Sequence, residues 1–184
     1  MKELNKMILV EDYNKRVIDE NGDQFFETVK VGQYKSKDNH VKRREGNIFK
    51  FADVSETQAL MTDLISRYEK NKAEFHPVVV ASMFHYKFIR IHPFDDGNGR
   101  VCRLLVNMML MNAGYPLFIV PTDQKDEYYD ILEYLDQQFT DVYAVINSNE
   151  SEKFDTFTDY IAKRLIWSID KMIQVRQQGL KFIR

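Results

Sequence analysis

Residues 76–116 read HPVVVASMFHYKFIRIHPFDDGNGRVCRLLVNMMLMNAGYP, which is two helical patterns joined by a short loop. Pro77 suits the first turn of a helix, where its missing N–H would have no acceptor in any case. The apolar run after it predicts a largely buried helix. That helix should stop before Pro93, because the residue preceding a proline avoids helical angles. A second helix is predicted over about 99–113, with Gly114 as its C-cap.

The loop between these helices concentrates groups that bind anions. Gly97, Asn98 and Gly99 come directly before the second helix, where glycine permits left-handed angles and successive N–H groups converge on one point. The helix N-terminus adds unpaired donors, and phosphate is a usual ligand of such sites. Arg100 and Arg103 share one helical face and suit phosphate oxygens. The pattern predicts a site for a polyphosphate chain.

Two further groups give this loop a chemical purpose. Asp96 would repel phosphates unless a hard cation lay between them, so Mg²⁺ is implied. His92 titrates near neutrality and suits the removal of a proton from an attacking hydroxyl. Pro93 and Phe94 are expected to be structural anchors of the loop. Together these residues predict nucleotidyl or phosphoryl transfer.

The rest of the chain predicts a mainly α fold with a small β-hairpin. Residues 3–18 are expected to form a short helix, and ENGD at 20–23 a hairpin or sharp reversal. The β-like pattern of 25–51 predicts an exposed hairpin with its loop near 36–39. Ser55 and Gln58 suggest a capping box for the next helix. Helices are also expected over 123–139 and 156–176, the last with an apolar face on a core: Phe157, Ile161, Leu165, Ile169, Met172 and Ile173.

Composition excludes several classes of protein. The chain has 184 residues, enough for one domain, with 44% apolar and 29% charged residues. Its net charge of −2 argues against non-specific binding to nucleic acid or to an acidic membrane. A single cysteine, Cys102, favours a reducing compartment and a packing role. With no signal-like or membrane-spanning run, the sequence predicts a cytoplasmic protein.

The segment HPFDDGNGRVCR, residues 92–103, resembles the signature of the Fic family, His-Pro-Phe-x-Asp/Glu-Gly-Asn-Gly-Arg-x-x-Arg, at every specified position. The flanking helices and DEYYDILEYLD at 126–136 are also similar. The resemblance implies the Fic fold, a helical bundle with a small β-hairpin flap beside the active-site loop. It implies a Fic domain over 32–176, with the flap at about 32–51 and the loop at 92–100. Residues 1–31 would pack on this core, and 177–184 would form a tail.

The resemblance implies a protein adenylyltransferase that moves AMP from ATP to a Tyr, Thr or Ser hydroxyl of a target protein and releases pyrophosphate. In that scheme His92 is the base and Asp96 holds Mg²⁺. Doc-type relatives that phosphorylate have lysine at the place of Gly99, so glycine favours AMP transfer. The residues expected to bind the nucleotide are Gly97, Asn98, Gly99, Arg100, Arg103, Tyr128 and Tyr129.

The resemblance also implies partners. The flap is expected to pair with the backbone of the target as an added strand. Its expected contact residues are Gln33, Tyr34, Lys35, Ser36 and Val41. A self-inhibitory Ser/Thr-x-x-x-Glu-Gly/Asn motif has only incomplete copies, at 16–21 and 41–47, so an inhibitory partner chain or oligomer partner is one expectation. Asp136 stands where some relatives have an asparagine near the base, which leaves the preference for ATP open.

Other interpretations of the same residues remain. In isolation His92 would suit a structural role, and His85 is expected to be a core residue. A hydrolase metal site made of His85, His92 and Asp96 would leave both arginines without a role. A transferase that uses UTP, GTP or a phosphocholine donor is one alternative function. A nucleotide- or peptide-binding module without turnover is another.

Overall fold

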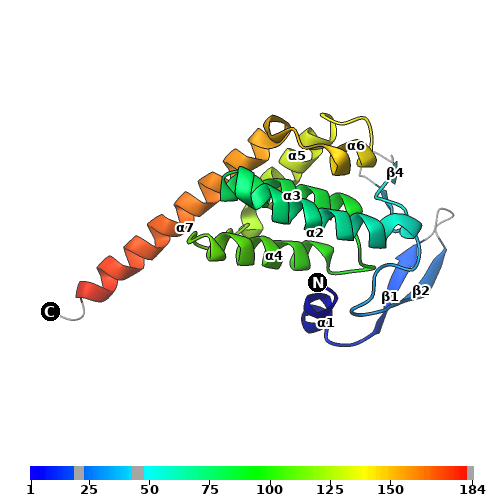
Figure 1. The fold of residues 1–184 in the computed structure, drawn as a ribbon. Coiled ribbons are helices and arrows are strands. Elements are labelled where there is room, and N and C mark those ends of the chain that lie inside the picture. Colours follow the sequence, from blue (N-terminus) through cyan, green and yellow to red (C-terminus); the bar gives the residue numbers. More distant parts are fainter. Residues whose placement is uncertain (19–22, 43–47, 182–184) are drawn as a thin grey trace.

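The computed structural model describes residues 1–18, 23–42 and 48–181 (Figure 1). Their helices are α1 (Lys2–Leu9), α2 (Thr57–Glu74), α3 (Pro77–Ile91), α4 (Asn98–Asn112), α5 (Lys125–Asp136), α6 (Val142–Asn147) and α7 (Asp155–Lys181), with single 3-10 turns η1 (Val54–Glu56), η2 (Thr122–Gln124) and η3 (Ser151–Phe154). Two antiparallel hairpins accompany them, β1 (Tyr13–Ile18) with β2 (Gln24–Val29) and β3 (Val41–Lys42) with β4 (Ile48–Phe49). The fold is mainly α with small sheets, as predicted.

The helix α3 is the centre of the bundle. Nearly all of its residues are buried, and α2, α4, α6 and α7 surround it. Burial on all sides explains why its sequence has no polar face. Pro77 lies in its first turn, as predicted, and the His76 ring accepts a hydrogen bond from the N–H of Val78 at 3.3 Å. The helix therefore begins and ends at fixed residues, and this places the loop that follows it.

The helix α4 also agrees with its sequence signals. It ends just before Gly114, which has a φ of +84°, a left-handed angle that glycine adopts without strain. The N–H of Tyr115 then bonds the carbonyl of Leu110 at 2.9 Å and closes the end of the helix. The loop between α3 and α4 is thus held between two well-terminated helices.

The helix expected over 3–18 is wrong beyond Leu9. Val10 adopts a left-handed φ of 72°, and the Asp12 carboxylate accepts the N–H of Val31 at 2.8 Å. The chain then enters β1, which pairs with β2 in a register that runs from Tyr13↔Val29 to Ile18↔Gln24. The hairpin expected around ENGD is confirmed by this pairing, although residues 19–22 lie outside the described part. The N-terminal segment therefore forms a helix and a hairpin.

The hairpin expected over 25–51 divides differently. Residues 24–29 pair with β1, and only 41–42 and 48–49 pair with each other. Residues 36–39 form an irregular segment before β3, so a loop lies there as predicted, but it does not join two strands that pair with each other. The connection between β3 and β4 falls at 43–47, outside the described residues. The Asn39 side chain of this irregular segment donates to the carbonyls of His92 and Phe94 in the loop between α3 and α4, and that competes with a strand ladder.

The capping box predicted at Ser55 and Gln58 is also wrong. Ser55 lies inside η1, and α2 begins two residues later, at Thr57, with Glu56 as an N-cap that makes no side-chain hydrogen bond. The hydroxyl of Thr57 instead donates to the carbonyl of Asp53 at 3.1 Å. The 3-10 turn provides acceptors for backbone N–H groups at this helix start, which a capping side chain would otherwise provide.

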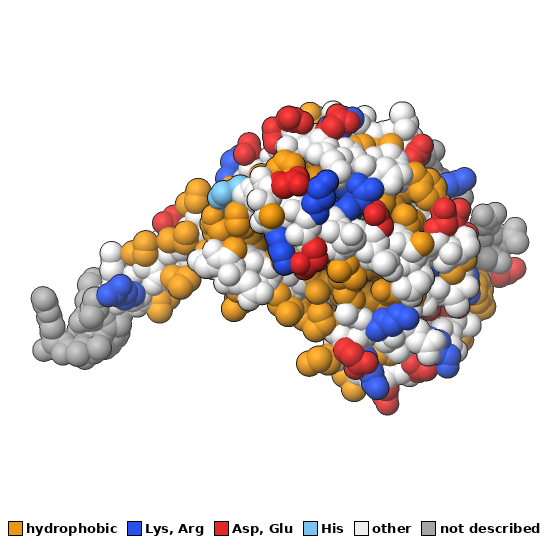
Figure 2. Space-filling view, in the orientation of Figure 1, with side chains coloured by type: hydrophobic (Ala, Val, Ile, Leu, Met, Phe, Trp, Pro, Cys, Tyr) orange, Lys and Arg blue, Asp and Glu red, His pale blue; other side chains and the backbone are white. Residues whose placement is uncertain are grey.

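The helix α7 is longer than predicted and leaves the bundle. Phe157, Ile161 and Leu165 are buried, as expected, but Ile169, Met172 and Ile173 are exposed, which corrects the prediction for these three. Figures 1 and 2 show the C-terminal half projecting from the body with apolar side chains along it. Helical periodicity shows that a face is apolar but not that anything covers it. Among the described helices, none has both the length and the hydrophobicity that crossing a bilayer requires.

Candidate active site

The loop between α3 and α4 begins at His92, which caps α3. Its φ of 51° and ψ of 60° are left-handed, and its N–H still reaches the carbonyl of Phe88 at 3.0 Å. Pro93 follows and cannot continue a helix. Phe94 is buried beside Tyr34 and Phe88, with ring centroids 5.5 and 6.4 Å away. The turn therefore starts at the side chain predicted to be the base and is fixed by an apolar anchor.

Every carbonyl from residue 91 to residue 96 accepts a hydrogen bond from a donor that other segments or the start of α4 supply. The pairs are Ile91 with Lys35 Nζ (3.1 Å), His92 with Asn39 Nδ2 (3.2 Å), Pro93 with Lys35 N (2.8 Å), Phe94 with Asn39 Nδ2 (2.9 Å) and Asn98 Nδ2 (2.6 Å), Asp95 with Lys15 Nζ (3.0 Å) and Asp96 with Asn5 Nδ2 (3.0 Å). These bonds fix the backbone of the loop before any ligand arrives. Such preorganisation is what an electrostatic site needs.

The N-terminus of α4 supplies free donors beside this loop. Gly97 is the N-cap, with a φ of +80°, and the N–H of Val101 is the first to reach back, to the Gly97 carbonyl at 2.9 Å. The amides of 98–100 therefore have no acceptor within the helix. A Cβ at Gly97 would lie 3.2 Å from Asn5 Nδ2, so glycine is required both for the angle and for space. The backbone here presents unpaired donors in a cradle whose geometry suits an anion, and the binding of one stays a prediction.

The side chain of Asn98 has a different role from the amides around it. Its Oδ1 accepts the N–H of Phe94 at 2.9 Å, its Nδ2 donates to the Phe94 carbonyl, and the residue is buried. The predicted nucleotide contact at this position therefore rests on the backbone N–H. The side chain closes the loop.

The two arginines of α4 complete the cradle. Arg100 is exposed at the lip, and Arg103 lies partly buried one turn further along. A Cβ added to Gly99 would lie 3.1 Å from Arg103 Nη1, so the glycine leaves room for that guanidinium. Gly99 lies within α4 at ordinary helical angles, so glycine here matters for the position of the arginine rather than for the backbone.

The imidazole of His92 is held in the form that a general base needs. Its Nδ1 lies 3.3 Å from the carbonyl of Ile89; since a carbonyl can only accept, Nδ1 carries the hydrogen and Nε2 keeps its lone pair. Phe51 stacks on the ring, with centroids 3.9 Å apart. The pKa of His92 is lowered to about 4, chiefly by burial; the nearby Lys35 and Arg90 cations contribute to the lowering, and the hydrogen bond with Ile89 opposes it. The ring is therefore neutral at pH 7.

The position of Phe51 is itself fixed by neighbouring polar groups. Asp38, His40 and Asp53 have side-chain atoms of the kind that bind metal ions within 4.8 Å of one another. The His40 Nδ1 accepts the N–H of Phe51 at 3.2 Å, and Asp38 Oδ1 accepts that of Val54 at 2.9 Å. These side chains support the segment that covers His92.

Asp96 keeps its charge at the lip of the cradle. Burial opposes ionisation, but hydrogen bonds from the Tyr13 hydroxyl and the Gly97 N–H, together with the Arg100 cation, outweigh it and hold the pKa of Asp96 below its ordinary value. The Arg100 Nη2 lies 3.5 Å from its Oδ2. An ionised carboxylate supplies the hard oxygen ligands that Mg²⁺ prefers, so Asp96 fits the role of metal ligand expected from the sequence.

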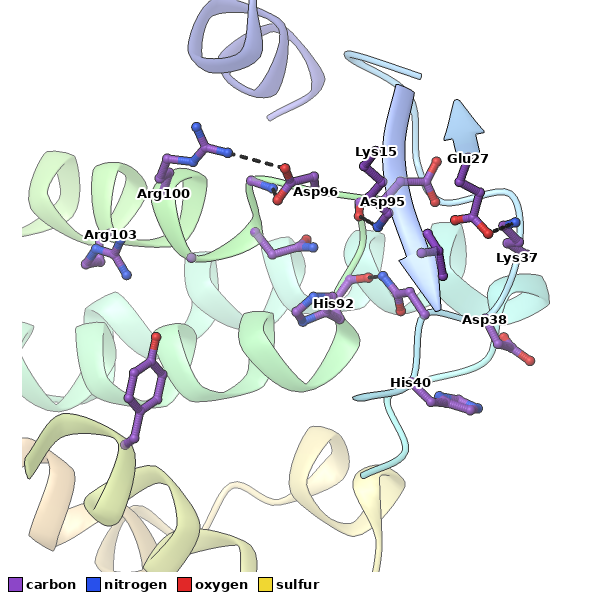
Figure 3. A pocket seen from close by; sticks show the side chains of 16 residues that line it. Lys15, Glu27, Lys37, Asp38, His40, His92, Asp95, Asp96, Arg100 and Arg103 are labelled. Atoms are coloured by element: carbon purple, nitrogen blue, oxygen red, sulfur yellow. Dashed lines mark hydrogen bonds and ion pairs between the residues drawn. The ribbon is translucent and has the colours of Figure 1, made fainter. Parts of the chain in front are cut away.

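These groups surround one cavity of about 540 Å³, a size typical of small-molecule sites (Figure 3). Figure 3 shows His92 with the arginines of α4 on one side and, on the other, Lys15 and Glu27 together with the segment that carries Asp38 and His40. The structure brings most of the predicted nucleotide, metal and base residues together here: His92, Asp96, Gly97, Asn98, Gly99, Arg100, Arg103 and Tyr129.

The two tyrosines predicted to contact the nucleoside differ in their positions. Tyr129 lines the cavity and is 59% exposed, whereas Tyr128 is 4% exposed and does not line it. The Tyr128 hydroxyl lies 3.1 Å from Nε2 of His85, deep in the core. The prediction for Tyr128 as a nucleoside contact is therefore wrong, because consecutive residues of a helix point about 100° apart. His85 is buried, as expected.

The residues predicted for the flap are also divided. Tyr34 packs on Phe94, and Lys35 is buried with its Nζ on the carbonyls of Ala52 (2.5 Å) and Ile91. Burial lowers the pKa of Lys35 to about 8. Gln33, Tyr34, Lys35 and Ser36 precede the β3–β4 hairpin and are not in its strands; only Val41 is. The side chains of Tyr34 and Lys35 support the loop between α3 and α4. Contact of these four residues with a target strand stays a prediction.

Several residues of the site carry no sequence signal. The loop is held by four residues that lie 53 to 91 positions away in sequence: Asn5, Lys15, Lys35 and Asn39. Each is a common polar residue in a polar stretch of sequence, so nothing marks it as a partner of the loop. Tyr13 lies in the segment predicted to be helical. Asp136, which departs from the asparagine of some relatives, pairs with the buried Arg90 at 2.5 Å. The glutamates of the incomplete inhibitory motifs, at 20 and 45, lie outside the described residues.

Comparisons with known proteins agree with this geometry. The sequence profile of the Fic/DOC family matches residues 2–110. A protein adenylyltransferase Fic from Drosophila virilis is 35% identical over 121 residues, which is 63% of this chain and 25% of that protein. One from Aedes aegypti is 56% identical over 59 residues, covering 32% of this chain and 12% of that protein.

A solved structure extends the likeness to the whole fold. A Fic domain-containing signaling protein from Bacteroides thetaiotaomicron has a TM-score of 0.78 and 37% identity, covering 92% of this chain and 59% of that one. The chain thus spans about a quarter of the Drosophila relative and well under two thirds of the solved protein.

Proposed function

Because the chain belongs to the Fic/DOC family, we propose that it transfers AMP from ATP to a hydroxyl side chain of a target protein. The observation that carries the proposal is the cavity in which a neutral histidine, Nε2 free, faces a helix N-terminus with two arginines. A base for a hydroxyl and a cradle for phosphates in one cavity suit attack on a phosphorus. The relatives named protein adenylyltransferase support this choice of reaction.

In this reaction His92 Nε2 takes the proton of the target hydroxyl as its oxygen attacks the α-phosphorus. The bond from that phosphorus to the oxygen bridging to the β-phosphate breaks, and pyrophosphate leaves with the electron pair. Negative charge grows on the leaving phosphates. The amides of residues 98–100 and the guanidinium groups of Arg100 and Arg103 border the same cavity as His92 and would stabilise this charge.

A magnesium ion would be held by the Asp96 carboxylate. Its oxygens are hard ligands, and its pKa is kept below the ordinary value, so the carboxylate is ionised at neutral pH. When bound, the ion would neutralise phosphate charge and polarise the bond to the leaving group. The chain's own contribution is to fix the carboxylate through the Gly97 N–H at 2.6 Å.

Intact-protein mass spectrometry tests the proposal directly. The protein is incubated with Mg²⁺ and, separately, with ATP, GTP, UTP or CTP, alone and with cell extract proteins. We expect ATP to add the mass of one AMP to protein, with no such addition by the His92→Ala variant, which should still bind ATP in calorimetry. Addition of a phosphoryl group, of another nucleotide, or of nothing while ATP binds would refute AMP transfer and identify the alternative.

A further inference from the structure

The β1–β2 hairpin has one face turned toward the active-site loop. Alternate residues of a strand point to one face, and residues directly opposite in the register share it. Lys15 and Val17 of β1 line the cavity, as does Glu27 of β2, which is opposite Lys15. Phe25 is opposite Val17, so it lies on the same face, at the end of the hairpin away from the anchoring α1.

The polar groups of this face already have partners. The Tyr13 hydroxyl donates to the Asp96 carboxylate, Lys15 Nζ donates to the Asp95 carbonyl at 3.0 Å, and Glu27 pairs with Lys37. An apolar pair remains on this face: Val17 lines the cavity, and Phe25, opposite it in the register, lies beside the lining and keeps 42% of its surface exposed. The hairpin is therefore tied down by its polar residues and presents an apolar pair beside the site.

We infer that Val17 and Phe25 form a docking surface for an apolar side chain of the target protein, next to the hydroxyl that is modified. The inference rests on the proposed function. A hydroxyl can reach His92 through the cavity, which is lined by Lys15, Val17 and Glu27 of this hairpin and by residues 37–40. A target segment that delivers the hydroxyl would lie across the hairpin face. On that face Val17 and Phe25 are apolar and can contact an apolar side chain of the target.

The next residue of β2 supplies a matched control. Phe26 is 74% exposed, more than Phe25, but it is opposite Arg16 and so lies on the face turned away from the cavity. A Phe25→Ala and a Phe26→Ala variant therefore remove the same side chain from adjacent positions of one strand. They differ in the face that is changed.

The experiment uses an array of peptides with a central Ser, Thr or Tyr and with apolar, acidic or basic residues varied at each flanking position. Incorporation of label from ATP labelled at the α-phosphate is measured for the wild type and both variants. We expect the wild type to prefer an apolar residue at one flanking position by about tenfold, which is the lower end of what one apolar contact gives. Phe25→Ala should lose this preference, while Phe26→Ala and Phe25→Leu should keep it.

A second readout does not depend on turnover. Fluorescently labelled His92→Ala protein is bound to the same array, with and without the Phe25→Ala change, and ATP affinity is measured to check the fold. If binding of the His92→Ala protein depends on Phe25 but the wild type labels no peptide, the result would support docking and count against AMP transfer. Labelling whose flanking preference is unchanged in Phe25→Ala, or equally lost in Phe26→Ala, would overturn docking and leave the transfer reaction standing. The absence of any binding preference overturns docking as well.

Discussion

Replacing Phe51 by alanine is expected to raise the pKa of His92 from about 4 toward its ordinary value of 6.5. The Phe51 ring stacks on the imidazole at 3.9 Å and excludes water from one of its faces. Burial is the main cause of the low pKa, so exposure of that face should restore hydration of the protonated form. The interval between 6.5 and about 4 corresponds to about 3.4 kcal/mol, at roughly 1.36 kcal/mol per pKa unit. With half of the burial removed, a rise of about 1 to 1.5 is expected.

The same shift has consequences for stability and rate. Because the folded-state pKa is below the unfolded one, the unfolded chain takes up the proton first as pH falls, and stability is lost between pH 6.5 and about 4. This loss should be smaller in the Phe51→Ala variant. If His92 is the base, the wild type should keep its rate of AMP incorporation down to about pH 5, whereas the variant should lose rate below about pH 6.

Histidine-ring NMR titration measures the pKa without any substrate. The chain has four histidines, and single His→Gln variants assign them. Phe51→Leu is the matched control, since an aliphatic side chain still covers the ring and should leave the pKa near 4. The buried His85, with a pKa of about 3, should be unchanged in both variants. A wild-type value near 6.5, or equal values in Phe51→Ala and Phe51→Leu, would show that the stacked ring does not control this histidine.

Three further predictions concern the loop and the two tyrosines. Asn5→Ala removes the donor to the Asp96 carbonyl and the acceptor of the Gly32 N–H, so urea unfolding should show a loss of about 2 kcal/mol; a loss below about 0.5 kcal/mol would contradict the tether. Gly99→Ala should displace the nearby guanidinium and weaken ATP binding about tenfold in calorimetry, with little change in Tm because that side chain is flexible; unchanged affinity would contradict it. Tyr128→Ala should cost about 3 kcal/mol or more in the core, whereas Tyr129→Ala should leave Tm within a degree or two and weaken ATP binding; the reverse result would exchange their roles.

The parts of the fold that local signals determine could be predicted from the sequence. Pro77 and Gly114 act through the backbone angles of their own residues, and both helix ends are where these residues place them. The glycines and arginines of the motif are likewise neighbours in sequence. Because they lie at the start of one helix, that helix alone brings them to the same cavity. Such features depend on few residues and on no distant partner.

What the sequence could not supply was the identity of distant partners. Lys35 looks like a solvated residue of a polar run, yet it is buried because two carbonyls, of Ala52 and Ile91, need a donor. The apolar face of α7 has the right period over its whole length, but its second half has no neighbour in the described fold. The β1 strand depends on pairing with β2 rather than on its own propensity. Each of these outcomes depends on contacts between segments far apart in the chain.

The tethering of the loop carbonyls has a consequence for how working members of such a family are recognised. Four of the donors, Asn5, Lys15, Lys35 and Asn39, lie upstream of the twelve-residue signature, in α1, in β1 and in the irregular segment before β3. A gene shortened by a few codons at its start would still contain every letter of the signature and would encode a misshapen pocket. An intact signature is therefore not sufficient for a pocket of this shape, which also depends on the hydrogen-bond donors upstream.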